Sequence, residues 1–288
     1  MANNYDPFEP NGSQNSQYPQ YPQYQSNPQG QYQDPQQAYQ QQMYQQQISR
    51  GAFGAQQPQY APGAVHAGAA AADVNDVLTK SFLFMFLALL VTGITALAVA
   101  NTTFWYSVRT NPAILIVFAV LEIAAVIGAT AAMKRNNLVL SAVLFGAYSI
   151  LNGVTLSIIF LAYELGSITQ VFFIAAGIFG VMALIGAITK KDLTNLGMIC
   201  IVGLFGILIA SLVNMFIGSA KMDYIISIIG VLVFVGLTAY DVQKIKKMAA
   251  TNVGYDPMVI GLYGAMELYL DFINLFLYLL RLFGKARN

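Results

Sequence analysis

The chain has few of the residue types on which most catalytic and metal sites depend. It contains one cysteine and one histidine among 288 residues, and 9% of its residues are charged. The lone Cys200 excludes an intrachain disulfide. The lone His66 excludes histidine-based catalysis and histidine-rich metal sites within the apolar part of the chain. There is no phosphate-binding glycine motif, no Ser/His/Asp set and no metal-spaced cysteine set. The net charge of +1 predicts no nucleic-acid partner.

The first 72 residues differ in composition from the rest of the chain. Segments such as QYPQYPQYQ and DPQQAYQQQMYQQQ are rich in Gln, Pro and Tyr and have neither helical nor strand periodicity. Such a segment buries too little apolar surface to offset the entropy lost on ordering. We therefore expect residues 1–72 to be a disordered tail without a cleavable signal peptide. A solvated tether and self-association through Tyr and Gln are both open roles for it.

From residue 73 onward, long apolar runs alternate with short polar breaks, and 57% of the whole chain is hydrophobic. Each run approaches the roughly 20 residues that a helix needs to cross a bilayer. The sequence therefore predicts an all-α membrane domain over residues 73–288 with seven transmembrane helices. The expected spans are 79–100, 112–132, 138–162, 170–189, 195–218, 224–247 and 258–283.

The basic residues predict an orientation for these spans. With seven crossings, nine Lys and Arg residues fall on the side of the N-terminus and five on the other side. The side with more of them is expected to be cytoplasmic, and the tail with it. Arg281, Lys285 and Arg287 oppose this assignment. The last span therefore either crosses fully, which we favour, or re-enters on the cytoplasmic side.

Two aspartates occur where a lipid bilayer should not tolerate them. Asp241 ends the apolar run 224–240, and Asp271 lies near the middle of the run 258–283. A charge at the membrane centre costs roughly 3 kcal/mol on insertion scales, so it usually has a partner or a function. A plainer alternative for Asp241 is a carboxylate near a helix end that pairs with one of the lysines following it.

The last span carries a polar stripe that contains one of these aspartates. Its members follow one another at spacings of four, four, three and four residues, which places them on one helical face. They are Tyr263, Glu267, Asp271, Asn274 and Tyr278. A stripe of this kind cannot face lipid, so we expect the seventh helix to be central. Interhelical hydrogen bonding is the plainer interpretation of the stripe. Glu122, in the second span, is either a hydrogen-bonded structural acid or part of the lining of a polar cavity.

Three segments carry a family resemblance: GLYGAMELYLDFINLFLYLLRLFG (261–284), AYDVQKIKK (239–247) and GAYSILNGVTLSIIFLAY (146–163). They strongly resemble the transmembrane Bax inhibitor motif family in its bacterial form, over about residues 75–284. The resemblance implies seven helices with the seventh surrounded by the others, a bacterial plasma membrane and a pH-sensitive calcium leak. It also implies that Asp241 and Asp271 are the paired aspartates of the family. Lys134 or Arg135, ending the second span, would then latch onto that pair.

The predicted function is a pH-sensitive, calcium-permeable leak and not an enzyme. Two close carboxyls in a poorly solvated site share a proton and titrate as a unit. Calcium takes about six to eight oxygens, so Asp241 and Asp271 would bind it weakly, helped by Glu267 and Asn274. Weak binding suits a leak, and no other cofactor is expected.

Two other functions stay open. One is a non-conducting scaffold that binds a membrane protease or a translocation partner through its tail. The other is an intramembrane aspartyl protease, for which the pair Tyr240-Asp241 fits. Asp271 does not fit that class, since it follows Glu-Leu-Tyr-Leu instead of a Gly-x-Gly run.

Overall fold

The structure is a computed structural model that describes residues 73–111, 113–251 and 254–287. The predicted disordered tail, residues 1–72, lies outside this part of the chain. Within the described ranges the secondary structure is helical, apart from one isolated bridge between Tyr163 and Ala286. The helices are α2 (Val74–Ala100), α3 (Phe104–Thr110), α4 (Ala113–Lys134), α5 (Leu138–Leu156), α6 (Ile159–Ala162), α7 (Leu165–Ile188), α8 (Thr194–Ile217), α9 (Ala220–Ala250) and α10 (Pro257–Phe283).

Seven segments of the described chain are long and apolar enough to cross a membrane, as the sequence predicts. They are α2, α4, α5 together with α6, α7, α8, α9 and α10. Local sequence fixes several of their ends. The Asp256 side chain accepts a hydrogen bond from Met258 N, and Pro257 is the first residue of α10. The aspartate satisfies an N–H that the first turn leaves free, and proline has no N–H to lose there.

The third span departs from the prediction because a turn at Ser157 divides 138–162 into α5 and α6. The Ser157 hydroxyl accepts a hydrogen bond of 2.9 Å from the indole nitrogen of Trp105. Trp105 belongs to α3, a short helix in a segment where we expected only a polar break. The neighbouring Phe104 ring packs edge-on against Phe118 of α4, with centroids 5.7 Å apart. A hydropathy pattern does not reveal aromatic packing of this kind, so it does not predict α3.

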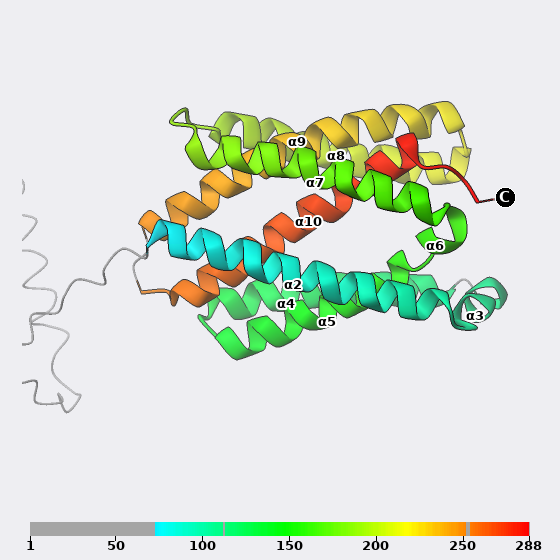
Figure 1. The fold of residues 1–288 in the computed structure, drawn as a ribbon, viewed down its shortest axis with the longest axis horizontal. Helices are drawn as coiled ribbons and strands as arrows, with labels where there is room; N and C mark the ends of the chain where they lie inside the picture. The colour runs from blue at the N-terminus through cyan, green and yellow to red at the C-terminus, as the bar shows by residue number, and fades with distance from the viewer. Residues whose placement is uncertain (1–72, 112, 252–253, 288) are drawn as a thin grey trace, which may run out of the picture. The chain divides into compact units, whose positions relative to one another are not determined.

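The last helix is the centre of the domain, as its polar stripe predicts. In its most apolar stretch 78% of the residues are buried, against 11% for α4. It packs against α2, α4, α5, α7 and α9. Figure 1 shows α10 running obliquely between a group formed by α2, α4 and α5 and a group formed by α7, α8 and α9. The outer helix α8 packs on α9 instead of on α10.

The two ends of α10 lie at opposite ends of the helix bundle. Before its first residue, Asp256 N donates to the Asn136 side chain, just after α4. Beyond its last residue, Lys285 N donates to Ser167 Oγ near the start of α7, and Arg287 N donates to Ala162 O. An unbroken 27-residue helix joins these two points. The helix therefore runs unbroken from one end of the bundle to the other.

The outward faces of the peripheral helices are apolar. Phe216 is 81% exposed, and Phe173 and Ile199 are each 69% exposed. Scattered exposed apolar residues are normal in soluble proteins. Continuous apolar faces on most helices of a domain instead indicate an apolar environment such as lipid. The outer surface therefore agrees with a helix bundle that lies in a membrane, with α10 enclosed inside it.

Candidate functional site

The site depends on the register between α9 and α10, which run antiparallel and pack on each other. At one end of their contact, the rings of Phe234 and Tyr278 stack with centroids 5.9 Å apart. At the other end, Ile245 packs closely on Gly264. A Cβ atom added to Gly264 would lie 2.8 Å from Ile245 Cδ1. Between these two contacts, Asp241 meets α10 beside Asp271.

Asp241 and Asp271 are buried, with 6% and 4% of their surface exposed. Their carboxyl groups lie within hydrogen-bonding reach of each other. Two carboxylates in such contact cannot both be ionised easily where water is scarce, so a single proton shared between them is favoured. Asp271 Oδ2 is buried and has no hydrogen-bond partner within the described ranges. A proton or a cation would relieve that costly state.

A third acid and a lysine complete the site. One helical turn before Asp271, Glu267 forms an ion pair of 2.7 Å from Oε2 to Lys244 Nζ. Lys244 Nζ is also 3.9 Å from Asp241 Oδ1. The same ammonium lies 5.2 Å from the centroid of the Tyr263 ring, a distance at which a cation is attracted to the ring face. The site is thus three carboxyls with one resident ammonium.

The predicted latch residues lie elsewhere. Lys134 and Arg135 are exposed at the end of α4, and no ion pair joins either of them to the described residues. The turn that follows them explains their position. Asn136 has a φ of 53° and its side chain bonds to the segment before α10, at Asp256 N. In this structure the cation at the acids is Lys244, on α9 itself, in agreement with the plainer interpretation of Asp241 as paired with a following lysine.

The predicted supporting residues Asn274 and Glu122 also have other partners. Asn274 donates a hydrogen bond of 2.8 Å to Leu270 O in its own helix. Glu122 Oε1 accepts one of 2.7 Å from the Thr155 hydroxyl of α5. Of the supporting set, the structure brings Glu267 to the aspartates. It adds Lys244, whose place beside Glu267 depends on the α9–α10 register, and it places this lysine over Tyr263, a member of the predicted stripe.

The remaining lysines of the α9 end are engaged with the loop between α7 and α8. Lys247 forms a 2.6 Å ion pair with Asp192, and Lys246 donates to the carbonyl of Ala187. Hydrogen bonds from Lys247 and then from Thr194 hold the pKa of Asp192 below its usual range. Asp192 therefore stays ionised at any pH near neutrality.

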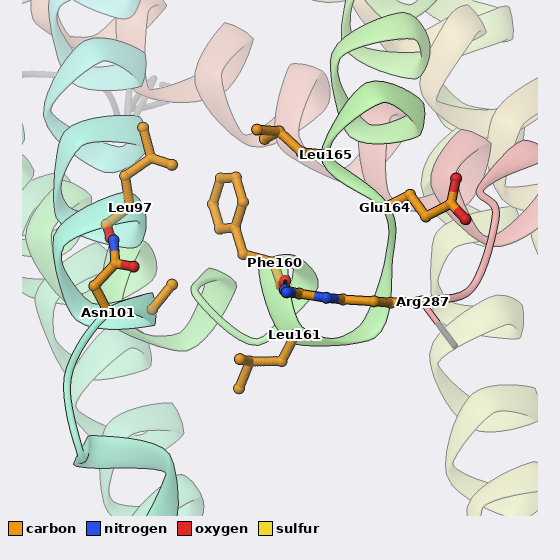
Figure 2. A pocket seen from close by; sticks show the side chains of 8 residues that line it. Leu97, Asn101, Phe160, Leu161, Glu164, Leu165 and Arg287 are labelled. Carbon is orange, nitrogen blue, oxygen red and sulfur yellow. Dashed lines mark hydrogen bonds between the residues drawn. The ribbon is translucent and has the colours of Figure 1, made fainter.

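Two cavities of the described structure lie away from the acids. A cavity of about 460 Å³ lies at the other end of the domain, between the end of α2, α6 and the start of α7. Figure 2 shows its Phe160 between Leu97 and Leu165, with Arg287 reaching across from the C-terminal segment. A second cavity, of about 370 Å³, is lined by α2, α5 and the start of α10. Neither of these two cavities is lined by Asp241 or Asp271.

The acidic site is not built as a tight metal centre. Among the described residues, no three His, Cys, Asp or Glu side chains are grouped to hold a metal ion. Calcium takes about six to eight oxygen ligands, and two aspartates supply too few. What the structure places together is two buried acids in contact, a third carboxyl one turn away and one ammonium beside them.

The comparisons with known proteins agree with this fold. The family described as "Inhibitor of apoptosis-promoting Bax1" matches residues 74–288. The inner membrane protein YbhL of Escherichia coli is 40% identical over 220 residues, covering 75% of this chain and 94% of YbhL. An uncharacterized protein of Borreliella burgdorferi is 42% identical over 220 residues, covering 74% of this chain and 94% of the relative. The chain therefore belongs to the Bax inhibitor family of membrane proteins.

Proposed function

We propose that this protein is a pH-sensitive, calcium-permeable leak whose gate is the buried pair Asp241 and Asp271. The observation that supports it best is the contact between these two carboxyls, one on the most buried helix and one on its neighbour. Burial of two acids in a membrane domain is costly and is rarely kept without a partner or a function.

The expected direction of the pH effect follows from the charges. Lys244 of α9 pairs with Glu267 of α10, and a single proton shared between Asp241 and Asp271 joins the same two helices. Further protonation as the pH falls neutralises the carboxyls and weakens these contacts. The two helices then separate more readily, so the leak increases as the pH decreases. The acids are a proton-sensitive switch on a packed helix pair.

Calcium is the cargo that the carboxyl oxygens favour. Hard divalent cations prefer carboxylate, carbonyl and water oxygens. Asp241, Asp271 and Glu267 would supply some of these, and water or backbone carbonyls would supply the rest. An incomplete ligand set binds weakly, and weak binding is what lets an ion leave again.

The membrane and orientation are part of the proposal. The relative YbhL is named an inner membrane protein, which favours the bacterial plasma membrane for this chain. The excess of Lys and Arg on one side favours a cytoplasmic N-terminus. Labelling of a cysteine placed at exposed Lys190, from inside but not outside intact cells, is the result expected of that orientation.

The test is calcium flux into proteoliposomes as a function of pH. Asp241→Asn and Asp271→Asn should each flatten the pH dependence of the flux, because asparagine neither gains nor loses a proton in this pH range. Asp192→Asn is the matched control, because the low pKa of Asp192 keeps it ionised across the pH range of the assay. A carboxyl with a lowered pKa loses its contribution only as the pH falls through that pKa, well below the range tested. If both site variants have the same flux and the same pH dependence as the wild type, the proposal is wrong.

Two other functions are separated by parallel assays. Paired aspartates in a membrane would also suit an aspartyl protease, so peptide cleavage sensitive to an aspartyl-protease inhibitor would favour that class. A scaffold acting through residues 1–72 would retain its partner after the Asp→Asn changes and lose it after removal of the tail. Neither result is expected if the protein is a leak.

A further inference from the structure

Lys244 is the cation of α9 that faces the acidic site. Its ammonium is 2.7 Å from Glu267 Oε2 and 3.9 Å from Asp241 Oδ1. Its side chain is 30% exposed, against 22% for Glu267 and 9% for Asp241. The ion pair therefore lies at the boundary between the buried aspartates and the surface, where an ion approaching from that end must pass.

The neighbouring lysines do not share this role. Lys247 pairs with Asp192, and Lys246 bonds to the backbone of Ala187. From α2, Lys80 is paired with Asp76 at 2.6 Å. Among the described residues, Lys244 is thus the one ammonium ion-paired with the carboxyls of the site.

We propose that Lys244 is a tethered counter-cation that occupies the position of a permeating cation, so that its ammonium must leave the carboxyls before a divalent cation can bind them. This proposal rests on the proposed function and names the competitor that keeps the site closed. A lysine ammonium is a compact charge on a flexible four-carbon chain, so it can swing from the acids to water without a change of backbone. At rest, the Lys244 ammonium pairs with Glu267. An incoming cation would bind next to it, at Asp241.

The consequence is a defined change in calcium affinity. A unit positive charge about 4 Å from a bound divalent cation is repulsive even with strong solvent screening. Replacing Lys244 by glutamine removes that repulsion and frees carboxyl oxygens. Calcium should then bind about tenfold more tightly.

Calcium binding to the purified full-length protein in detergent tests this directly, with calorimetry as the readout and flux in proteoliposomes beside it. Lys244→Gln should bind calcium about tenfold more tightly than the wild type and pass it faster. Lys244→Arg keeps the positive charge and should not tighten calcium binding. Lys247→Gln, on the same helix but paired with Asp192, should also resemble it. Gel filtration confirms that each variant is folded.

The outcomes separate this proposal from the one on which it rests. If Lys244→Gln matches the wild type in affinity and flux while the aspartate variants lose the pH dependence of the flux, the leak stands and the counter-cation is wrong. If Lys244→Arg tightens binding as much as Lys244→Gln, charge is not the cause and the proposal is again overturned. If neither the wild type nor Lys244→Gln binds or passes calcium, both proposals fall.

Discussion

At the scale of single residues, α10 presents polar groups on two sides. Asp271 meets Asp241 of α9. Tyr269, two residues earlier and therefore about 200° around the helix, places its hydroxyl 2.6 Å from Thr92 Oγ1 of α2. Phe145 and Tyr148 of α5 lie edge-on against the Tyr269 ring, at 5.7 and 5.6 Å. The proton-sensitive contact and the structural contact thus lie on different faces of one helix.

Tyr269→Phe removes the structural hydrogen bond and leaves the acidic site intact. Tyr269 is fully buried, so the loss should destabilise the protein by about 1 kcal/mol. That corresponds to a melting temperature lower by roughly 2 to 4 °C in detergent. Tyr224→Phe, at a tyrosine that is 59% exposed, is the control and should melt like the wild type. Equal melting of both variants, or a changed pH dependence in Tyr269→Phe, would contradict this division of roles.

Some of these residues were predictable and others were not. The stripe spacing identifies Glu267 and Asp271 as neighbours on one face, because it needs only helical periodicity. Tyr269 lies outside that stripe and is found only from its contact with Thr92. Lys244 appears in the sequence as one of several lysines after Asp241. Its pairing with Glu267 depends on contact between two helices, which the period of either helix alone does not contain.

At the scale of helices, α7 and α9 approach each other through Gly186. A Cβ at that position would collide with the backbone carbonyl of Ala239, two residues before Asp241. Because backbone atoms cannot rotate away as a flexible side chain can, only glycine fits this contact without moving a helix. Small residues commonly permit such close approach between membrane helices.

Gly186→Ala should therefore push α7 away from α9 and cost about 1 to 3 kcal/mol of stability. Gly180→Ala is the matched change on the same helix, where no atom lies within 4 Å of an added Cβ. Alanine is the better helix former, so that variant should be neutral or slightly more stable. Thermal unfolding in detergent measures both. A Gly186→Ala protein as stable as Gly180→Ala would show that the two helices are free to separate here.

Helix existence followed from hydropathy, and helix length did not. The seven apolar runs predicted seven spans because each is long enough to cross a bilayer. The prediction ended the sixth span at residue 247, whereas α9 continues to Ala250. Its last turns contain Lys246 and Lys247, whose polar side chains end a hydropathy run. The helix nevertheless continues past these two lysines, whose side chains bond to Ala187 and Asp192.

At the scale of the whole molecule, the central helix α10 carries Asp271 and Glu267, its neighbour α9 carries Asp241, and the surrounding helices enclose them. The polar stripe predicted this arrangement because a helix with buried polar groups must be enclosed. The sequence did not predict which cation lies beside the acids. Lys134 and Arg135 are suitable in charge and are still directed elsewhere by the turn at Asn136. In the proposed function, the enclosed acids and the tethered lysine form the resting state, which a proton or a competing cation opens.

The central claim is that Asp241 and Asp271 act as one proton-sharing unit, and a double-variant cycle of calcium flux against pH tests it most directly. If they are a unit, removing either acid removes most of the pH response, and Asp241→Asn/Asp271→Asn should show little further loss beyond each single variant. Single variants that each keep half of the pH response, with additive effects in the double variant, would show two independent acids and contradict the account.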